Sequence, residues 1–232
     1  MIEVNNELYR LNSESDDIEE RGLALYKRGR VFQLQENDKK ALEMFILFIE
    51  EADRYQKDLS LNMRRYYCRA YIRAAHLLMK LDGDASSIEY YLRLADEKTN
   101  VLIETVESID SLSTKAFYEE ICAEYNKKIN NSAQEMFHLE NAIELCNRML
   151  RRKNDRSYLN SKYRFLNRIY DIQVAMAEYD DALHTIEHMV DLDIILHDKC
   201  EISTLRKKYE LYQILNMDTL EIKKNLEKEM RQ

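Results

Sequence analysis

The chain has 232 residues and a net charge of −8, with 34% charged residues, no proline and three glycines. An acidic balance of this size argues against a general nucleic-acid binder. Three glycines effectively exclude phosphate cradles of the P-loop or dinucleotide-binding type. The scarcity of helix breakers predicts an almost wholly helical protein.

Hydrophobic periodicity and capping residues predict four helical hairpins followed by two more helices. Asn37 precedes one helical run, and Gly83 fits a left-handed cap before Asp84 restarts the chain. Ser132 and Glu135 have the spacing of a capping box. No alternating β-branched run indicates a strand. The predicted hairpins cover residues 16–55, 58–107, 112–153 and 157–199, and C-terminal capping helices cover 201–232.

An internal repeat relates the four hairpins. On the first helices, apolar residues recur at helical spacing around positions about 46 to 48 residues apart: Gly29, Ala75, Cys122 and Tyr170. About a dozen residues after each, a small or hydroxyl residue opens the second helix: Ala41, Ser87, Ala133 and Ala182. Such equivalence predicts one continuous stack and a single domain over residues 1–232.

These positions resemble the tetratricopeptide repeat. The first hairpin matches at Gly29, Phe32, Ala41 and Phe45, and the closest local match is Ala177-Glu178-Tyr179-Asp180-Asp181-Ala182-Leu183. The third hairpin fits only with a one-residue slip. The resemblance implies an all-α, right-handed stack of antiparallel helical hairpins with about 9–10 helices, whose concave face binds a protein segment. The missing closing proline and the period beyond the usual ~34 residues indicate longer helices than the standard repeat has.

The resemblance also implies which residues line the concave face. In the second hairpin they are Arg69, Ile72, Arg73, His76, Met79 and Lys80, and in the fourth Arg164, Asn167, Arg168 and Asp171. The cations of the second hairpin, Arg69, Arg73, His76 and Lys80, form one stripe because they are spaced four, three and four residues apart. Guanidinium forks match carboxylate and phosphate oxygens. The stripe, together with Arg164, Asn167 and Arg168, therefore predicts a groove for an acidic or phosphorylated segment.

A competing interpretation is a solvated helix face whose cations pair with acids of the neighbouring repeat, such as Glu119 and Glu120. A second basic run lies at the end of one helix and across the following turn, where it complements the helix dipole: Arg148, Arg151, Arg152, Lys153 and Arg156. A nucleic-acid or partner patch on that turn is the alternative for this run.

Two patterns raise the question of metal chemistry. Residues 184–188 have the H-x-x-E-H spacing of one metallopeptidase class. Glu135 with His138, and Asp181 with His184, have the spacing of di-iron carboxylate bundles. Both patterns lie on second helices of hairpins and lack the surrounding chemistry of those enzymes. The sequence therefore predicts no catalytic residue, cofactor or metal.

The remaining features bear on the cellular compartment and on the functional class of the protein. The four cysteines are far apart and form no CxxC pair, which indicates reduced core thiols. No apolar run approaches a membrane span, and residues 1–7 lack the features of a signal peptide. We expect a cytoplasmic, non-enzymatic scaffold or adaptor. The alternatives are a peptide-sensing domain of a bacterial signalling system, a metal-dependent enzyme and a self-association module.

Overall fold

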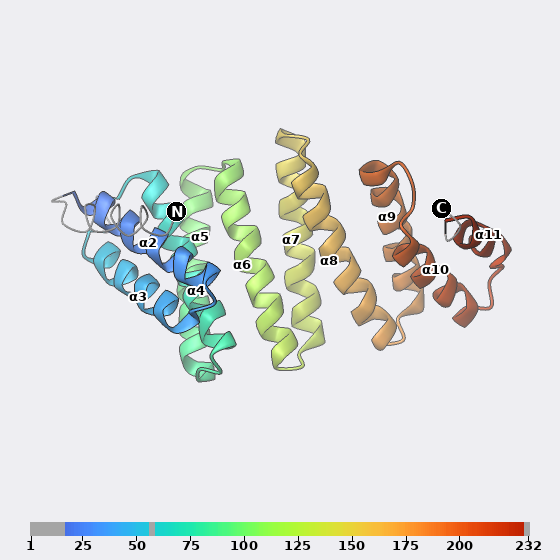
Figure 1. The fold of residues 1–232 in the computed structure, drawn as a ribbon, viewed down its shortest axis with the longest axis horizontal. Coiled ribbons are helices and arrows are strands. Elements are labelled where there is room, and N and C mark those ends of the chain that lie inside the picture. Colours follow the sequence, from blue (N-terminus) through green and yellow to red (C-terminus); the bar gives the residue numbers. More distant parts are fainter. Residues whose placement is uncertain (1–16, 56–58, 230–232) are drawn as a thin grey trace. The chain divides into compact units, whose positions relative to one another are not determined.

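The computed structural model describes residues 17–55 and 59–229. Within these residues the chain forms ten α-helices and no strand, joined by short turns (Figure 1). The prediction of an all-α stack of helical hairpins is confirmed. Residues 1–16, which include the acidic segment 1–7, lie outside the described part of the chain.

The observed hairpins follow the predicted boundaries closely. The first two are α2 (Ile18–Leu34) with α3 (Asp38–Arg54), and α4 (Leu61–Lys80) with α5 (Ala85–Thr105). The helices α6 (Ile109–Lys128) and α7 (Ser132–Arg152) come next in the chain, and α8 (Arg156–Ala175) forms a further hairpin with α9 (Tyr179–His197). Two further helices follow, α10 (Ile202–Ile214) and α11 (Leu220–Glu229).

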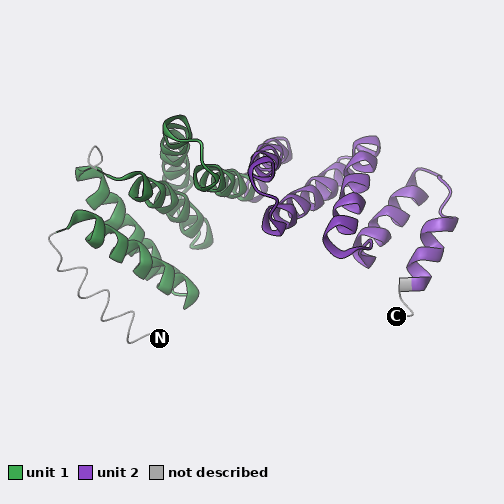
Figure 2. Ribbon diagram, turned by 90° about the horizontal axis from the view of Figure 1, so that it is seen from above, with its two compact units in different colours: residues 1–125 green, residues 126–232 purple. Residues whose placement is uncertain are grey.

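The helices divide into two compact units, residues 1–125 and 126–232, with the boundary inside α6 (Figure 2). In the first unit α2 packs against α3 and α4, and α4 also packs against α3 and α5. In the second unit α7 packs against α8, α8 against α9, α9 against α10, and α10 against α11. The single domain over residues 1–232 and the right-handed sense of the stack stay predictions.

A Schellman turn joins the two helices of each hairpin. The residue with positive φ is non-glycine in all four turns: Glu36, Asp82, Asn130 and Ala177. The following amide donates to the carbonyl five residues earlier, as from Asn37 N to Phe32 O at 2.9 Å. After α4 the left-handed residue is Asp82, so the placement of Gly83 in that role was wrong. Gly83 instead donates the closing bond to Leu78 O at 2.8 Å.

The register of the second helices follows from their N-caps. Asn37, Asp84 and Asn131 cap α3, α5 and α7 with their side chains, and Glu178 takes this position before α9. Four residues after each cap lies a buried side chain: Ala41, Ile88, Glu135 and Ala182. The placement of Ser87 and Ala133 at equivalent positions was therefore wrong, since Ser87 is half-buried and Ala133 exposed.

Two local causes explain this shift. The turn before α5 has one extra residue, Gly83, and α7 is capped by Asn131 rather than by Ser132. The predicted capping box at Ser132 was therefore wrong, and the side chain of Glu135 points to another helix. The first-helix positions Gly29, Ala75, Cys122 and Tyr170 are all buried. Gly29, Ala75 and Tyr170 lie seven residues before the left-handed turn residue, whereas Cys122 lies eight before Asn130 and is therefore one residue out of register.

The core of the first unit is centred on α4. This helix packs against α2, α3 and α5, and it buries residues around much of its circumference, among them Tyr67, Tyr71, Ile72 and Leu77. Three of the four cysteines, Cys68, Cys122 and Cys146, are buried free thiols. Because α4 is packed on several sides, its basic residues lie on a helix whose position is fixed.

The C-terminal helix α11 packs against α10. Ile222 is buried and Leu226 half-buried, while the other described side chains of α11 are mostly exposed.

Candidate functional site

The basic stripe of α4 lies against side chains from three other helices. Arg69, Arg73 and His76 are half-buried and Lys80 is exposed. Arg69 donates from Nε to Thr114 Oγ1 at 3.0 Å and from Nη2 to Ser113 Oγ at 3.4 Å. Both of its acceptors are neutral hydroxyl groups on α6.

Arg73 lies one turn further along α4 and also bonds neutral groups. Its Nε donates to Tyr26 OH at 3.1 Å and its Nη1 to Gln33 Oε1 at 3.0 Å, both on α2. Its guanidinium carbon lies 5.1 Å from the centroid of the Phe117 ring. A cation over an aromatic face gains some electrostatic stabilisation, but its charge is not neutralised.

A third arginine belongs to this site and was missed by the sequence analysis. Arg30 on α2 is half-buried and donates from Nη1 to Gln33 Oε1 at 2.9 Å. Arg30 occupies in the first hairpin the position that His76 occupies in the second, six residues before the left-handed turn residue. The repeat itself could therefore have identified it. We call Arg30, Arg69 and Arg73 the arginine cluster.

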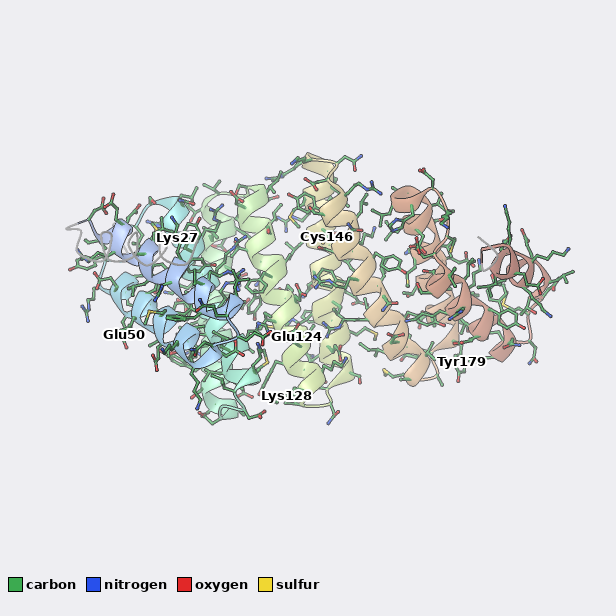
Figure 3. The ribbon with its side chains drawn as sticks, in the orientation of Figure 1. Lys27, Glu50, Glu124, Lys128, Cys146 and Tyr179 are labelled. Carbon is green, nitrogen blue, oxygen red and sulfur yellow. The ribbon has the colours of Figure 1, made fainter. Side chains whose placement is uncertain are left out.

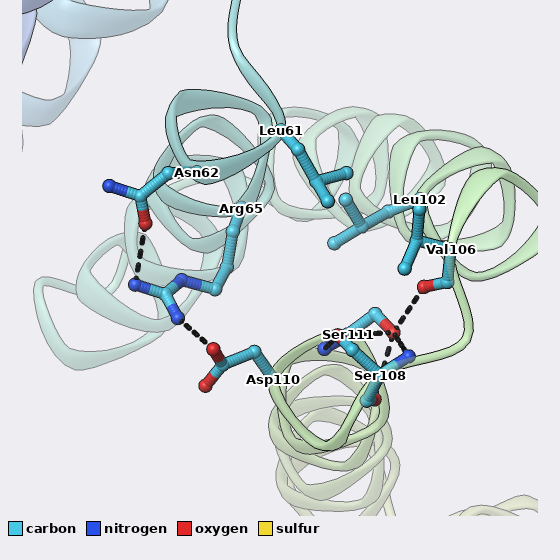
Figure 4. A pocket seen from close by; sticks show the side chains of 8 residues that line it. All are labelled: Leu61, Asn62, Arg65, Leu102, Val106, Ser108, Asp110 and Ser111. Atoms are coloured by element: carbon cyan, nitrogen blue, oxygen red, sulfur yellow. Dashed lines mark hydrogen bonds and ion pairs between the residues drawn. The ribbon is translucent and has the colours of Figure 1, made fainter.

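No carboxylate among the described residues forms an ion pair with the arginine cluster, although other cations of α4 do have acidic partners. Arg65 pairs with Asp110 at 2.6 Å (Figure 4). Lys80 pairs with Asp38 at 2.7 Å. The positive charge that remains uncompensated on this face is therefore concentrated on the arginine cluster.

The competing interpretation, pairing with acids of neighbouring helices, holds for two residues of the stripe, though with other partners. His76 lies 3.6 Å from Glu124, labelled on α6 in Figure 3. Lys80 pairs with Asp38 on α3. Glu119, proposed from the sequence as a partner, lies 3.5 Å from Lys115 instead.

Burial and mutual repulsion set the electrostatics of the cluster. Burial lowers the pKa of Arg69, and the positive charges of Arg65 and Arg73 lower it further, while Tyr26 and the carboxylate of Asp110 raise it. Burial also lowers the pKa of Arg73, with an opposing increase from Tyr26 and a further decrease from Arg30. Arginine stays charged at neutral pH, so the repulsion persists unless an anion offsets it.

His76 contributes little positive charge at neutral pH. Burial lowers its pKa, and the charges of Lys80 and Arg73 lower it further. These effects outweigh the attraction of the carboxylates of Asp38 and Glu120, which raise the pKa. The arginines rather than His76 therefore supply the charge of this face.

The predicted residues of the fourth hairpin lie on α8 in the second unit. Arg168 pairs with Glu135 at 2.6 Å, and Asn167 Oδ1 accepts from Lys207 Nζ at 2.9 Å. Arg164 is exposed, with its guanidinium carbon 5.2 Å from the centroid of the Phe165 ring. Their convergence with the α4 stripe on one groove stays a prediction, because the two groups belong to different units.

Two cavities lie beside α4 and α5 in the first unit. One of about 150 Å³ is lined by Leu61, Leu102, Val106 and the Arg65–Asp110 pair, among others (Figure 4). The other, of about 270 Å³, includes Tyr67, Cys68 and Leu102 in its lining. Burial raises the pKa of Cys68 to about 12, so its thiol is protonated and a poor nucleophile at neutral pH.

The histidine patterns do not assemble into a metal site within the described residues. His184 and His188 are exposed, and no group of three His, Cys, Asp or Glu side chains there is placed to hold a metal ion. Glu187 accepts hydrogen bonds from Lys208 Nζ and Tyr212 OH, both at 3.0 Å. Glu135, from the di-iron pattern, is engaged by an arginine.

The second basic run has partners in its own neighbourhood. Arg151 pairs with Glu144 at 3.0 Å and Lys153 with Asp155 at 2.9 Å. Arg156 donates to the carbonyl of Leu196 near the end of α9. The dipole interpretation, which concerns the end of α7, stays a prediction.

No protein-family model and no curated protein matches the sequence. Among solved structures, the chain is similar to BtubC (BKLC) from P. vanneervenii, with a TM-score of 0.63 and 14% identity. That alignment covers 98% of this chain and 88% of the other. A designed helical repeat protein, DHR64, aligns at 15% identity over 94% of this chain and 99% of its own, with a TM-score of only 0.27.

The similarity to BtubC concerns the fold alone, since identity is low. It agrees with a helical-repeat architecture, while the resemblance to the tetratricopeptide family rests on the sequence motifs only. Among the described residues, no helix is long and apolar enough to cross a membrane.

Proposed function

We propose that the protein is a non-enzymatic binding module of the cytoplasm that holds an acidic or phosphorylated segment of a partner protein against α4. Stacked helical repeats commonly serve as interaction scaffolds, because they present long surfaces built from equivalent helices. The proposal places the segment along Arg69 and Arg73, with His76 and Lys80 further along the same helix. Arg164, Asn167 and Arg168 are proposed to contribute from the second unit.

The observation that carries the proposal is the uncompensated charge of Arg69 and Arg73. Both guanidiniums are half-buried and bond hydroxyl or amide oxygens, not carboxylates. A partly desolvated cation without an anionic partner is unfavourable, and such features are concentrated at functional sites. An anionic ligand would offset both charges and would form charge-assisted hydrogen bonds.

The test uses an array of peptides matched in length that are acidic, phosphorylated, neutral or basic. We expect the wild-type protein to retain the acidic and phosphorylated peptides, with affinities that fall as salt is added. Arg69→Gln/Arg73→Gln removes both charges but keeps hydrogen-bonding groups, and Arg69→Glu/Arg73→Glu reverses them. Both variants should lose binding with unchanged helicity in circular dichroism.

The matched control is Arg151→Glu/Arg152→Glu, which reverses two exposed charges in the second basic run. This variant should bind as the wild type does. Equal binding of neutral or basic peptides, or undiminished binding by both α4 variants, would reject the proposal. Loss of binding in the control alone would place the functional surface at the turn between α7 and α8.

A further inference from the structure

Two arginines of the cluster share a single neutral oxygen. Gln33 Oε1 accepts from Arg30 Nη1 at 2.9 Å and from Arg73 Nη1 at 3.0 Å. Guanidinium groups are strongly bound by carboxylate and phosphate oxygens, whose negative charge an amide oxygen lacks. Gln33 thus accepts a hydrogen bond from each of the two cations but neutralises neither charge, and both guanidiniums are half-buried.

The charge and donor count of the cluster match a phosphoryl group better than a carboxylate. Arg30, Arg69 and Arg73 carry three positive charges without a carboxylate partner among the described residues. A phosphomonoester has a charge of roughly −1.5 to −2 at pH 7 and three strong acceptor oxygens. A single carboxylate has one negative charge and two oxygens.

The uncompensated charge is confined to a short stretch of α4, which fits one phosphoryl group and not a polyanion. Towards the N-terminus of the helix Arg65 is neutralised by Asp110, and towards the C-terminus Lys80 is neutralised by Asp38. Nucleic acids need many cations along an extended path, and the chain as a whole is acidic, at −8. A protein segment with one phosphorylated side chain brings a single phosphoryl group to this short stretch and does not need cations along an extended path.

We propose that the arginine cluster binds the phosphoryl group of a phosphorylated protein segment, and that Gln33 occupies the place of a phosphoryl oxygen until the segment binds. This inference rests on the proposed function and adds Arg30 and Gln33 to the site. In the bound state phosphoryl oxygens accept from Arg30 and Arg73, and the Gln33 amide turns away. Arg69 Nη2, held only by the 3.4 Å bond to Ser113, turns to a further oxygen.

Substitution of Gln33 separates this mechanism from a packing role. Gln33→Glu keeps the size of the side chain but supplies the missing carboxylate between Arg30 and Arg73. The free protein should then melt a few degrees higher, and phosphoryl binding should weaken by about tenfold or more. Gln33→Ala removes the competing oxygen, so its phosphoryl affinity should equal or exceed that of the wild type. Gln35→Glu, an exposed position two residues away, adds the same charge and should change neither property.

Three probes are titrated against the wild type and these variants by calorimetry: inorganic phosphate, a peptide with one phosphoserine, and the same peptide with Glu in its place. We expect the affinity for the phosphoserine peptide to be higher than that for the Glu peptide by about tenfold or more. Inorganic phosphate should raise the melting temperature of the wild type and not that of Gln33→Glu. Equal weakening by Gln33→Glu and Gln33→Ala, or no effect of Gln33→Glu, overturns the inference.

The outcomes also distinguish this inference from the proposed function. If acidic peptides bind through Arg69 and Arg73 but phosphate and phosphoserine confer no advantage, the phosphoryl inference fails and the proposed function stands. If inorganic phosphate binds and no peptide does, the proposed function fails, and with it the protein segment as the source of the phosphoryl group.

Discussion

Glu135 on α7 and Arg168 on α8 form a largely buried ion pair, with Oε1 2.6 Å from Nη2 and side chains 7% and 21% exposed. Glu135 occupies the position that Ala41, Ile88 and Ala182 fill in the other hairpins. A charged pair thus replaces an apolar contact at one place in the stack. Arg168 is already neutralised, so it is a weaker candidate for ligand binding than Arg69 or Arg73.

Removing one partner of this pair should be costly. Glu135→Ala leaves the Arg168 charge without its partner, and we expect a loss of about 3–5 kcal/mol in the free energy of unfolding. The double variant Glu135→Ala/Arg168→Met should recover much of this loss, because neither charge remains. Urea denaturation of both variants measures the difference. Additive losses in the double variant would show that the two side chains contribute independently.

Ala177 adopts a left-handed conformation, with φ of 59°. A β-carbon is unfavourable there, and glycine is not. Ala177→Gly should therefore stabilise the protein by about 0.5–1 kcal/mol, after allowance for the greater flexibility of glycine in the unfolded chain. Ala175, exposed in the last turn of α8, is the control: Ala175→Gly should destabilise by about 0.5–1 kcal/mol. Thermal unfolding of the two variants should shift in opposite directions.

Gly29 allows close approach of α2 to α3. A β-carbon at this position would lie 2.8 Å from Cε1 and 2.9 Å from Cζ of the fully buried Phe45 ring. Gly29→Ala should cost about 1–3 kcal/mol, since the ring has to move within a packed core. In the double variant Gly29→Ala/Phe45→Leu the smaller side chain leaves room for the methyl group. A total cost equal to the sum of the single variants would contradict this contact.

His76 should make stability depend on pH. Because the folded protein lowers the pKa of His76, the unfolded chain binds a proton at a higher pH than the folded protein does. The contribution is present above the unfolded pKa of about 6.5 and is lost as pH falls below it. Over pH 7 to about 5, stability should therefore decline less in His76→Gln than in the wild type. Parallel declines in urea titrations would contradict the lowered pKa.

Local sequence signals predicted the helices well, because capping groups and hydrophobic periodicity act over a few residues. Asn37 and Asp84 cap the helices that follow them, as expected. Where two caps were adjacent in sequence, at Asn131 and Ser132, the pattern alone selected the wrong one. That error moved the register of α7 and concealed the buried position of Glu135.

The candidate site was predicted only in part, because its electrostatics depend on residues remote in sequence. The spacing of Arg69 and Arg73 placed both on one face of α4. Whether a cation is neutralised depends on packing: Asp38 reaches Lys80 from α3, whereas Gln33 and Tyr26 reach Arg73 from α2. No local pattern distinguishes these outcomes.

The Schellman turns have a consequence for how the chain folds. Each turn is closed by backbone bonds between residues at most five apart, so a hairpin needs no distant segment to form its corner. The turn forms with chemically different residues at its left-handed position, namely Glu36, Asp82, Asn130 and Ala177. Proteins rich in such short-range contacts have low contact order and cross their folding barriers quickly. We therefore expect ordering of the chain to start at several places, one in each hairpin.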